Sequence, residues 1–233
     1  MTAQEGGALY LAKSKADIEA EYEAVAQAPE DYLKAKWGSQ ESMQNRFRLG
    51  REVIGWTGVE RWLDVGCGVG GFFKYVLASG GAPGCMVGVD ICASLTAQAG
   101  QRPIGQKARF LTADLEALPA ELGDFDLMTM LGVLQQCGAR PEAALAACAS
   151  RLRPGGQLFF TTKNARWEAF TSGLLTPEPS HSWFDPEELF AILRSLGLRL
   201  VQSGGFLPRE NARTKLNASH SIYVLAVRPA VQP

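Results

Sequence analysis

The chain has 233 residues, of which 46% are hydrophobic, and its formal net charge is −1. This length suits one large domain with a terminal extension or two small domains, and the apolar fraction is enough for a substantial core. The near-neutral charge argues against a nucleic-acid partner, because binding to phosphates normally needs an excess of basic residues.

The first quarter of the chain is predicted to be helical. Residues 1–13 show no hydrophobic period, and we expect them to fray. A helical pattern begins at Ser14, which forms a capping-box start with Asp17. Two more helices are predicted at 31–36 and 42–56. We expect residues 1–57 to form an N-terminal helical extension that folds as a lid over the ligand of the remaining region, 58–233.

After Gly58 short apolar strands alternate with helices. Strands are predicted at 61–65, 86–89, 108–112, 125–130 and 157–162, and helices at 71–79, 93–101 and 141–152. This alternation indicates a parallel sheet covered on both faces, with the carboxyl ends of the strands at one edge. The ligand crevice is expected at that edge, beside the first strand.

The last part of the chain differs from a purely parallel fold. Residues 165–184, which carry several aromatic side chains and prolines, are expected to form an insertion above the active edge. A helix then begins at Asp185 as N-cap with Pro186 in its first position, and Gly197 ends it. The strands predicted at 198–202 and 221–227 are joined by a polar loop, so they should pair antiparallel.

The segment WLDVGCGVGGFF, residues 62–73, contains the G-x-G-x-x-G spacing of a dinucleotide-binding loop. Glycines at 66 and 68 let the backbone turn sharply and approach a ligand. Asp64, two residues earlier, would repel a pyrophosphate but would attract an ammonium or sulfonium centre. S-adenosylmethionine carries both groups, so the carboxylate favours that cofactor over a nicotinamide dinucleotide.

Side chains at the ends of the next strands fit the same cofactor. Asp90 offers two acceptor oxygens for two adjacent ribose hydroxyls. Asp114 can accept a hydrogen bond from the adenine amino group. Ile91, Leu115 and Leu131 can enclose the adenine or line the methionine chain.

Five motifs in order, LDVGCGVG, VGVDI, TADLEALP, FDLMTMLGVLQQ and LRPGGQLFFTT, resemble those of class I S-adenosylmethionine-dependent methyltransferases, small-molecule subgroup. The resemblance covers Trp62–Thr162, and WFDPEELFAILRSLGLRLV with the final hairpin resembles the family's C-terminal part. It implies a Rossmann-like, doubly wound α/β sheet of seven strands in the order 3-2-1-4-5-7-6, with the last strand antiparallel. It implies cofactor contacts at Asp64, Gly66, Cys67, Gly68, Asp90, Ile91, Asp114, Leu115 and Leu131.

Two side chains of the predicted lid are further cofactor candidates. Arg46 could bind the methionine carboxylate, and Trp37 could shield the methyl group. Structural alternatives stand beside these interpretations. Arg46 could be a solvated arginine on a packing helix, Asp64 could cap the glycine loop, and Asp114 could cap a turn.

Methyl transfer from a sulfonium is an in-line displacement, and alignment supplies much of its catalysis. A general base helps where the acceptor is a hydroxyl or a protonated amine. Many members of the resembled subgroup have a histidine shortly after the fourth strand, where this chain has Gln135 and Gln136 instead; a glutamine such as Gln135 can orient a substrate but cannot take its proton. His181, in the insertion, is the other catalytic candidate, with a surface loop histidine as its alternative.

The sequence therefore predicts a methyltransferase acting on O or N of a small-molecule acceptor, such as a natural-product intermediate. The absence of an N-P-P-[YF] motif after the fourth strand agrees with the charge in disfavouring nucleic acid. The alternatives are an RNA or protein methyltransferase and a non-catalytic S-adenosylmethionine-binding module. An NAD-dependent oxidoreductase is disfavoured by Asp64 and by the antiparallel ending. The sequence is compatible with a homodimer and does not fix the oligomeric state.

The cysteine pattern and the hydropathy indicate the compartment. The five cysteines are odd in number and form no C-x-x-C pair, which argues against disulfide or metal frameworks. The first residues lack the apolar segment of a signal peptide, and no apolar run approaches the ~18 residues of a membrane span. We therefore expect a cytoplasmic protein with free thiols and no membrane partner.

Overall fold

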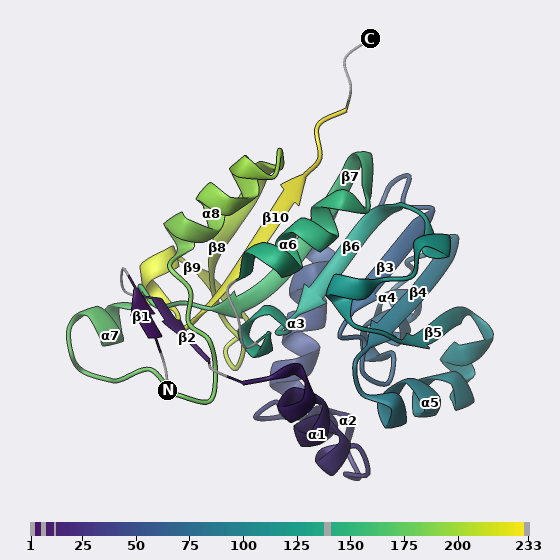
Figure 1. Cartoon of the computed structure of the whole chain (residues 1–233), viewed down its shortest axis with the longest axis horizontal. Helices are drawn as coiled ribbons and strands as arrows, with labels where there is room; N and C mark the ends of the chain where they lie inside the picture. The colour runs from purple at the N-terminus through teal and green to yellow at the C-terminus, as the bar shows by residue number, and fades with distance from the viewer. Residues whose placement is uncertain (1–2, 6–7, 12, 138–140, 231–233) are drawn as a thin grey trace.

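A mixed eight-stranded sheet forms the centre of the molecule (Figure 1). The computed structural model describes residues 3–5, 8–11, 13–137 and 141–230. The strands lie in the order β5-β4-β3-β6-β7-β10-β8-β9. Their bounds are β3 (Arg61–Val65), β4 (Cys85–Asp90), β5 (Ala108–Thr112), β6 (Phe125–Leu131), β7 (Leu152–Lys163), β8 (Arg199–Leu207), β9 (Ala212–Thr214) and β10 (Ser221–Val227).

The topology confirms the predicted sheet and adds one strand. Strands β3 to β7 pair in parallel, whereas β10 is antiparallel to both of its neighbours, β7 and β8. The seven predicted strands therefore have the order 3-2-1-4-5-7-6 with the last one antiparallel. The additional β9 pairs antiparallel with the outer edge of β8. It has only three residues, too few for an alternating pattern to indicate a strand.

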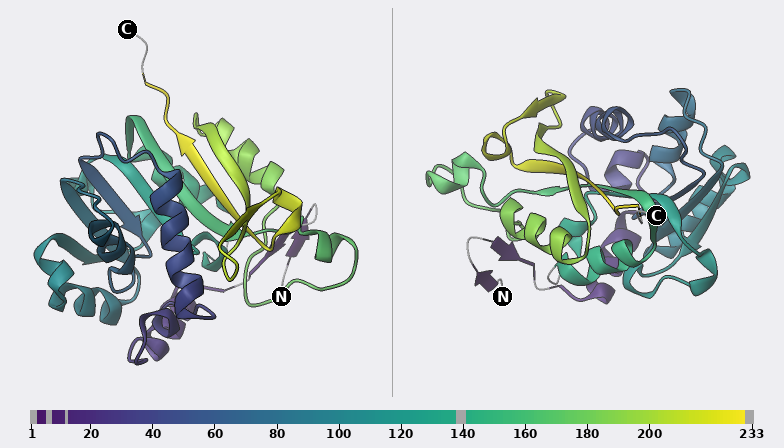
Figure 2. Two further views of the ribbon diagram at one scale, coloured as in Figure 1. Left: turned by 180° about the vertical axis from the view of Figure 1, so that it is seen from behind. Right: turned by 90° about the horizontal axis from the view of Figure 1, so that it is seen from above.

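Helices cover both faces of the sheet (Figures 1 and 2). Helices α6 and α8 pack on one face, and α3 and α4 pack on the other. The helix bounds are α1 (Lys15–Val25), α2 (Asp31–Lys34), α3 (Gln40–Val53), α4 (Gly71–Ala78), α5 (Ala93–Gln101), α6 (Pro141–Ser150), α7 (Glu168–Thr171) and α8 (Pro186–Ser195). Short 3₁₀ turns are η1 (Pro103–Gln106), η2 (Leu115–Ala117), η3 (Ala120–Leu122), η4 (Leu134–Gln136) and η5 (Leu216–Ala218).

Alternation along β3 divides its side chains between the two cores. Leu63 and Val65 belong to the core under α6 and α8, whereas Trp62 packs edge-on against Phe72 and Phe73 of α4. Since successive side chains of a strand point to opposite faces, Asp64 shares the face of Trp62. A carboxylate is thus placed inside the layer between the sheet and α4.

The predicted helix caps are present. Ser14 and Asp17 form the complete capping box of α1. Asp185 accepts the amide of Glu187 at 3.0 Å, and Pro186 is the first residue of α8. These two helix starts could be predicted from the sequence because each capping side chain accepts from an amide only two or three residues away.

The expectation that residues 1–13 fray is wrong for those that the structure describes; residues 1–2, 6–7 and 12 lie outside the described part. Strands β1 (Ala3–Glu5) and β2 (Ala8–Tyr10) pair antiparallel. Leu9 also exchanges two backbone hydrogen bonds with Trp183, at 2.9 and 2.7 Å. The stabilising partner lies in the distant insertion, so no local pattern indicated it.

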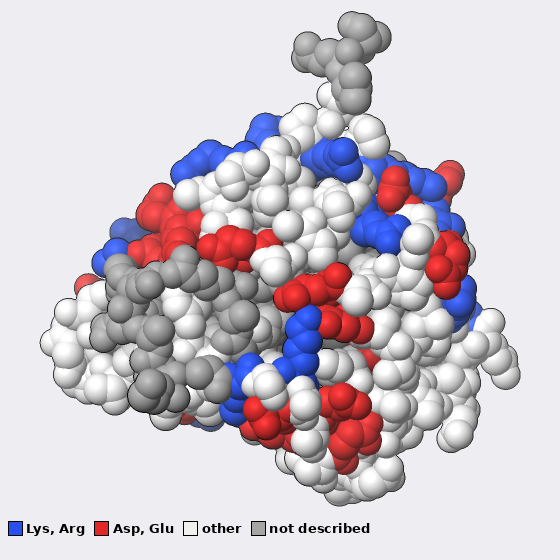
Figure 3. Space-filling model, in the orientation of Figure 1, with Lys and Arg blue, Asp and Glu red and all other residues white. Residues whose placement is uncertain are grey.

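The described helices include none that is both long and apolar enough to cross a membrane. Acidic and basic side chains are interspersed over the face in Figure 3, and no continuous basic surface appears on the described part of that face.

Candidate functional site

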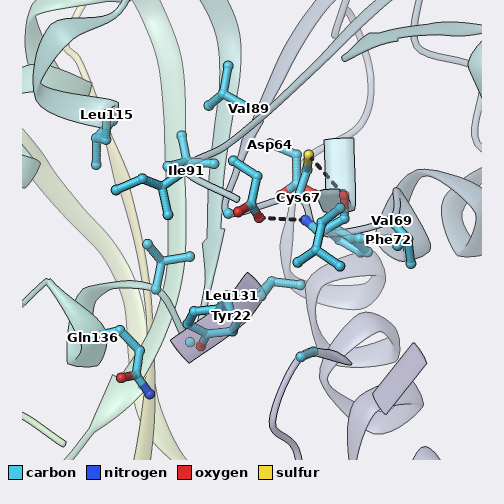
Figure 4. A pocket seen from close by; sticks show the side chains of 18 of the residues that line it. Tyr22, Asp64, Cys67, Val69, Phe72, Val89, Ile91, Leu115, Leu131 and Gln136 are labelled. Atoms are coloured by element: carbon cyan, nitrogen blue, oxygen red, sulfur yellow. Dashed lines mark hydrogen bonds between the residues drawn. The ribbon is translucent and has the colours of Figure 1, made fainter. Parts of the chain in front are cut away.

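A pocket opens at the carboxyl ends of β3, β4 and β6, and helix α1 and the segment before α3 cover it (Figure 4). Figure 4 shows side chains from these strand ends and from α1 converging on it. Every predicted cofactor residue except Arg46 lines this pocket, namely Trp37, Asp64, Gly66, Cys67, Gly68, Asp90, Ile91, Asp114, Leu115 and Leu131.

The glycine loop folds back over β4. The amides of Gly66 and Cys67 donate to the carbonyl of Val89 at 2.8 and 3.1 Å. Gly66 has φ +66°, and a Cβ there would lie 2.2 Å from Cγ2 of Val133, so both conformation and space require glycine. Gly68 also has a positive φ of +51°. The loop backbone can therefore approach a ligand directly, just before α4 begins.

Asp90 fixes this loop from the end of β4. Its Oδ2 accepts the amide of Gly68 at 2.8 Å, and its Oδ1 accepts the amide of Cys92 at 3.0 Å. Burial raises the pKa of the Asp90 carboxyl, and these backbone hydrogen bonds oppose the rise. Each carboxylate oxygen keeps a second lone pair, so both can still accept from a ligand hydroxyl.

Asp64 is buried, with only 3% of its surface exposed. Its Oδ1 accepts the hydroxyl of Thr129 at 2.5 Å, and Thr129 in turn accepts Nε1–H of Trp62 at 2.8 Å. Burial raises the pKa of Asp64 to about 7, with a further rise from the charge of Asp90. No amide of the glycine loop, all of which lies within the described residues, donates to Asp64. Asp90, not Asp64, caps the loop.

Asp114 does cap a turn, as its structural alternative supposed. Its Oδ1 accepts the amide of Glu116 at 3.0 Å, at the start of η2. Its other oxygen pairs with Nζ of Lys15 in α1, which also reaches Glu116 at 2.9 Å. Asp114 therefore ties α1 to the end of β5 while lining the pocket, and its contact with adenine stays a prediction.

The sequence did not indicate how the N-terminal helices attach. Glu23 of α1 accepts the amide of Ser94 at 3.0 Å, at the start of α5. Asp31 of α2 forms a bidentate ion pair with Arg102, with both distances 2.8 Å. Tyr22 of α1 also lines the pocket, a role that the helical pattern after Ser14 did not indicate. Helices α1 and α2 are thus fixed to α5 beside the pocket.

Arg46 does not line this pocket. Its guanidinium stacks on the indole of Trp37, 5.0 Å from the ring centroid, and donates to the carbonyl and hydroxyl of Ser42 at 3.0 and 2.6 Å. Trp37 does line the pocket. Arg46 therefore borders the pocket through the indole, and its contact with the methionine carboxylate stays a prediction.

The insertion is attached beside the end of β6. The amide of Ser182 donates to the carbonyl of Gln135 at 2.9 Å. A Cβ on Gly132 would lie 3.8 Å from Nε2 of Gln135 and 3.6 Å from Nε1 of Trp37, so both side chains border this glycine. Neither Gln135 nor His181 lines the pocket itself, although the neighbouring Gln136 does.

His181 is half-buried at the end of the insertion. Its Nδ1 lies 3.0 Å from the hydroxyl of Ser180 and 3.6 Å from the carboxylate of Glu178. Burial lowers the pKa of His181 to about 4, and the positive charge of Lys163 adds to this effect. The imidazole is therefore neutral at pH 7, and the lowered pKa makes it a weaker proton acceptor than an ordinary histidine.

The family model described as "Methyltransferase domain" matches residues 63–160. The ubiquinone biosynthesis O-methyltransferase of Xanthomonas axonopodis pv. citri (strain 306) is 33% identical over 186 residues, covering 72% of this chain and 76% of the relative. The same-named protein of Coxiella burnetii (strain Dugway 5J108-111) is 32% identical, covering 61% of this chain and 65% of the relative. The chain belongs to the class I S-adenosylmethionine-dependent methyltransferases. It is an enzyme of that family, and S-adenosylmethionine is its cofactor.

Solved structures share the fold. Magnesium protoporphyrin IX methyltransferase from Synechocystis PCC 6803, with bound S-adenosylhomocysteine, superposes with a TM-score of 0.65 at 17% identity, covering 92% of this chain and 100% of that one. The N-methyltransferase NodS from Bradyrhizobium japonicum WM9 superposes with a TM-score of 0.65 at 17% identity, covering 91% of this chain and 98% of that one. At these identities the likeness concerns the fold alone.

Proposed function

We propose that the protein transfers a methyl group to a hydroxyl of a small aromatic acceptor, which binds between the N-terminal segment and the insertion 165–184. The observation that carries this proposal is the attachment of the insertion beside the end of β6, through Ser182 and Gln135, where the methionine part of the cofactor would lie. The aromatic side chains Trp37 and Trp183 lie on the two segments that flank that end. The similarity to relatives named O-methyltransferases favours oxygen over nitrogen.

The pocket residues fit the cofactor. Asp64 is a buried carboxylate whose Oδ2 accepts no hydrogen bond from the described residues, so it suits the methionine ammonium. The two backbone hydrogen bonds of Asp90 hold it in place to receive the ribose hydroxyls, and at Gly68, where a Cβ would meet no atom within 4 Å, the backbone is open to close approach. Ile91 would pack on the adenine. Once bound, the cofactor supplies an electrophilic methyl group on a sulfonium.

The chain contributes positioning, exclusion of water and removal of one proton. The lid helices, fixed by Glu23 and Asp31, cover the pocket and keep water from the sulfonium. Gln135 would orient the acceptor hydroxyl by its side-chain amide. His181, neutral at pH 7, would take the hydroxyl proton as the oxygen attacks. We propose that residues 1–57 act as the lid of the methyltransferase domain 58–233.

Incubation with cofactor carrying a deuterated methyl group tests this function. Mass spectrometry of a panel of catechols, phenols and aromatic amines should show labelled ethers from the phenolic members. Labelled amines alone would contradict O-methylation. Binding of S-adenosylhomocysteine without any product would reject these acceptor classes. Salt-sensitive RNA binding would favour an RNA methyltransferase.

Replacing His181 by alanine should lower kcat at least tenfold with an uncharged catechol, while the Kd for S-adenosylhomocysteine changes less than twofold. The reason is that the imidazole would accept the acceptor's proton without touching the cofactor. His220, the other histidine, has its pKa lowered to about 4 by burial as well, so His220→Ala is the matched comparison. If His181→Ala turns over as fast as the wild type, His181 is not the general base, and catalysis rests on the alignment of acceptor and cofactor.

We extend the proposal to the oligomeric state and the cellular compartment of the protein. We expect the protein to act in the cytosol, as a monomer or a homodimer, and sedimentation of the purified chain distinguishes the two states. A small-molecule acceptor needs no nucleic-acid surface, which agrees with the interspersed charges in Figure 3.

A further inference from the structure

Two cationic side chains lie beside the end of the pocket that Leu131 lines. Lys163 is the last residue of β7, and two residues earlier Thr161 pairs with Leu131, which lines the pocket. The amide of Gly132 donates to the carbonyl of Thr161 at 3.1 Å. Neighbouring strands lie about 4.8 Å apart, so Lys163 stands one strand away from the pocket wall.

Arg46 of α3 is the second cation. Trp37, on which its guanidinium rests, borders Gly132 and Gln135, and the amide of Ser182, the residue before Trp183, donates to the carbonyl of Gln135. Nζ of Lys163 lies 5.0 Å from the ring centroid of Trp183, and the Arg46 guanidinium lies 5.0 Å from that of Trp37. Each cation thus rests on an indole, one from the insertion and one from the segment before α3.

Neither cation has a carboxylate partner within hydrogen-bond reach among the described residues. Lys163 makes no hydrogen bond there, and Arg46 donates only to Ser42. Burial lowers the pKa of Lys163 to about 8 and that of Arg46 to about 10, and Glu178 opposes the effect on Lys163 only from a distance, with its own side chain 70% exposed. Half-buried charges are normally paired, because desolvation is otherwise uncompensated.

We propose that Lys163 and Arg46 bind an acidic group of the acceptor, so that the substrate is an aromatic acid whose carboxylate lies between the two cations. The inference rests on the proposed function, since it names the substrate class of the same site. The indoles of Trp37 and Trp183 would flank the ring of that acid. An anion here supplies the charge compensation that the protein lacks.

Paired acceptors test this subsite. We would compare 3,4-dihydroxybenzoate with its uncharged methyl ester, which presents the same two hydroxyls. The wild type should prefer the acid by at least tenfold in kcat/KM. Lys163→Met should reduce that ratio to within about twofold, whereas Lys163→Arg, which keeps the charge, should retain most of it. Lys107→Met, at an exposed lysine before β5, is the matched control and should leave the ratio unchanged.

Other roles for the two cations give different results. A Lys163 that served as general base would lose kcat with both acceptors, and Lys163→Arg would not restore it. An Arg46 that bound the methionine carboxylate would, as Arg46→Met, weaken S-adenosylhomocysteine binding and leave the acid-to-ester ratio intact. Either result, or a wild type that does not distinguish acid from ester, overturns the proposal.

A binding measurement separates this inference from the proposed function. Titration calorimetry with S-adenosylhomocysteine present should show that 3,4-dihydroxybenzoate binds at least tenfold more tightly than its ester, and that Lys163→Met abolishes the difference. Binding of the acid without turnover would reject O-methylation of catechols and keep the anion subsite. Turnover of both acceptors at equal efficiency would keep the proposed function and reject the subsite.

Discussion

Replacing Asp90 by alanine should weaken binding of S-adenosylhomocysteine at least tenfold, or about 1.4 kcal/mol. The substitution removes the two oxygens that would accept the ribose hydroxyls. It also leaves the amides of Gly68 and Cys92 without their acceptors, which loosens the glycine loop. Leaving a buried amide unpaired costs about 1–3 kcal/mol, so the variant should also unfold at a lower temperature.

Asp126 provides the matched control for that loss of stability. Its Oδ2 accepts the amides of Glu60 and Arg61 at 3.1 and 2.8 Å, beside the amino end of β3, outside the pocket. Asp126→Ala should therefore lower the melting temperature without weakening the binding of S-adenosylhomocysteine. Calorimetric titration of both variants measures the affinities. An unchanged Kd in Asp90→Ala would remove Asp90 from the site.

The sheet was predictable because each element carries its own local signal. Strands β3 to β7 each contain a short, largely apolar segment, and the caps at Ser14 and Asp185 bond to amides nearby in the chain. The strand order came from the resemblance to a family, not from periodicity. The pairing of Leu9 with Trp183 could not be predicted, because it joins residues more than 170 positions apart.

The pocket residues were predictable because a parallel sheet brings the carboxyl ends of its strands to one edge. That rule alone places Asp64, Asp90 and Leu131 together. It does not indicate which carboxylate caps the loop, since this depends on the register between β3 and β4. It also leaves the ion pair of Lys15 with Asp114 unforeseen, because charged residues on α1 have many potential partners in the sequence.

Asp64→Asn should stabilise the protein above pH 7 in the absence of cofactor. The carboxyl has a pKa of about 7 when folded, against 3.8 as its ordinary value. The folded state therefore holds a proton that the unfolded state releases, and stability falls as the pH rises from about 4 through 7. Three pKa units correspond to an upper bound of about 4 kcal/mol. Asparagine avoids this loss and can still accept the hydroxyl of Thr129.

Thermal unfolding between pH 5 and 8 measures the effect. The melting temperatures of the wild type and Asp64→Asn should diverge as the pH rises. A variant less stable than the wild type at pH 8 would contradict the assignment of Asp64 as a destabilising buried acid.

Asp64→Asn should also weaken the binding of S-adenosylhomocysteine at least tenfold at pH 8. The ionised carboxylate would attract the methionine ammonium, and the neutral asparagine side chain cannot. Wild-type affinity should increase between pH 6 and 8 as Asp64 ionises, whereas the variant's affinity should change less over the same range. Asp90 also carries a raised pKa, so the pH dependence that disappears in Asp64→Asn isolates the contribution of Asp64. A variant that gained stability and kept its affinity would show that the buried carboxylate serves some other ligand. Loss of affinity together with gained stability would show that the protein tolerates an unfavourable buried charge because the cofactor's cation compensates it.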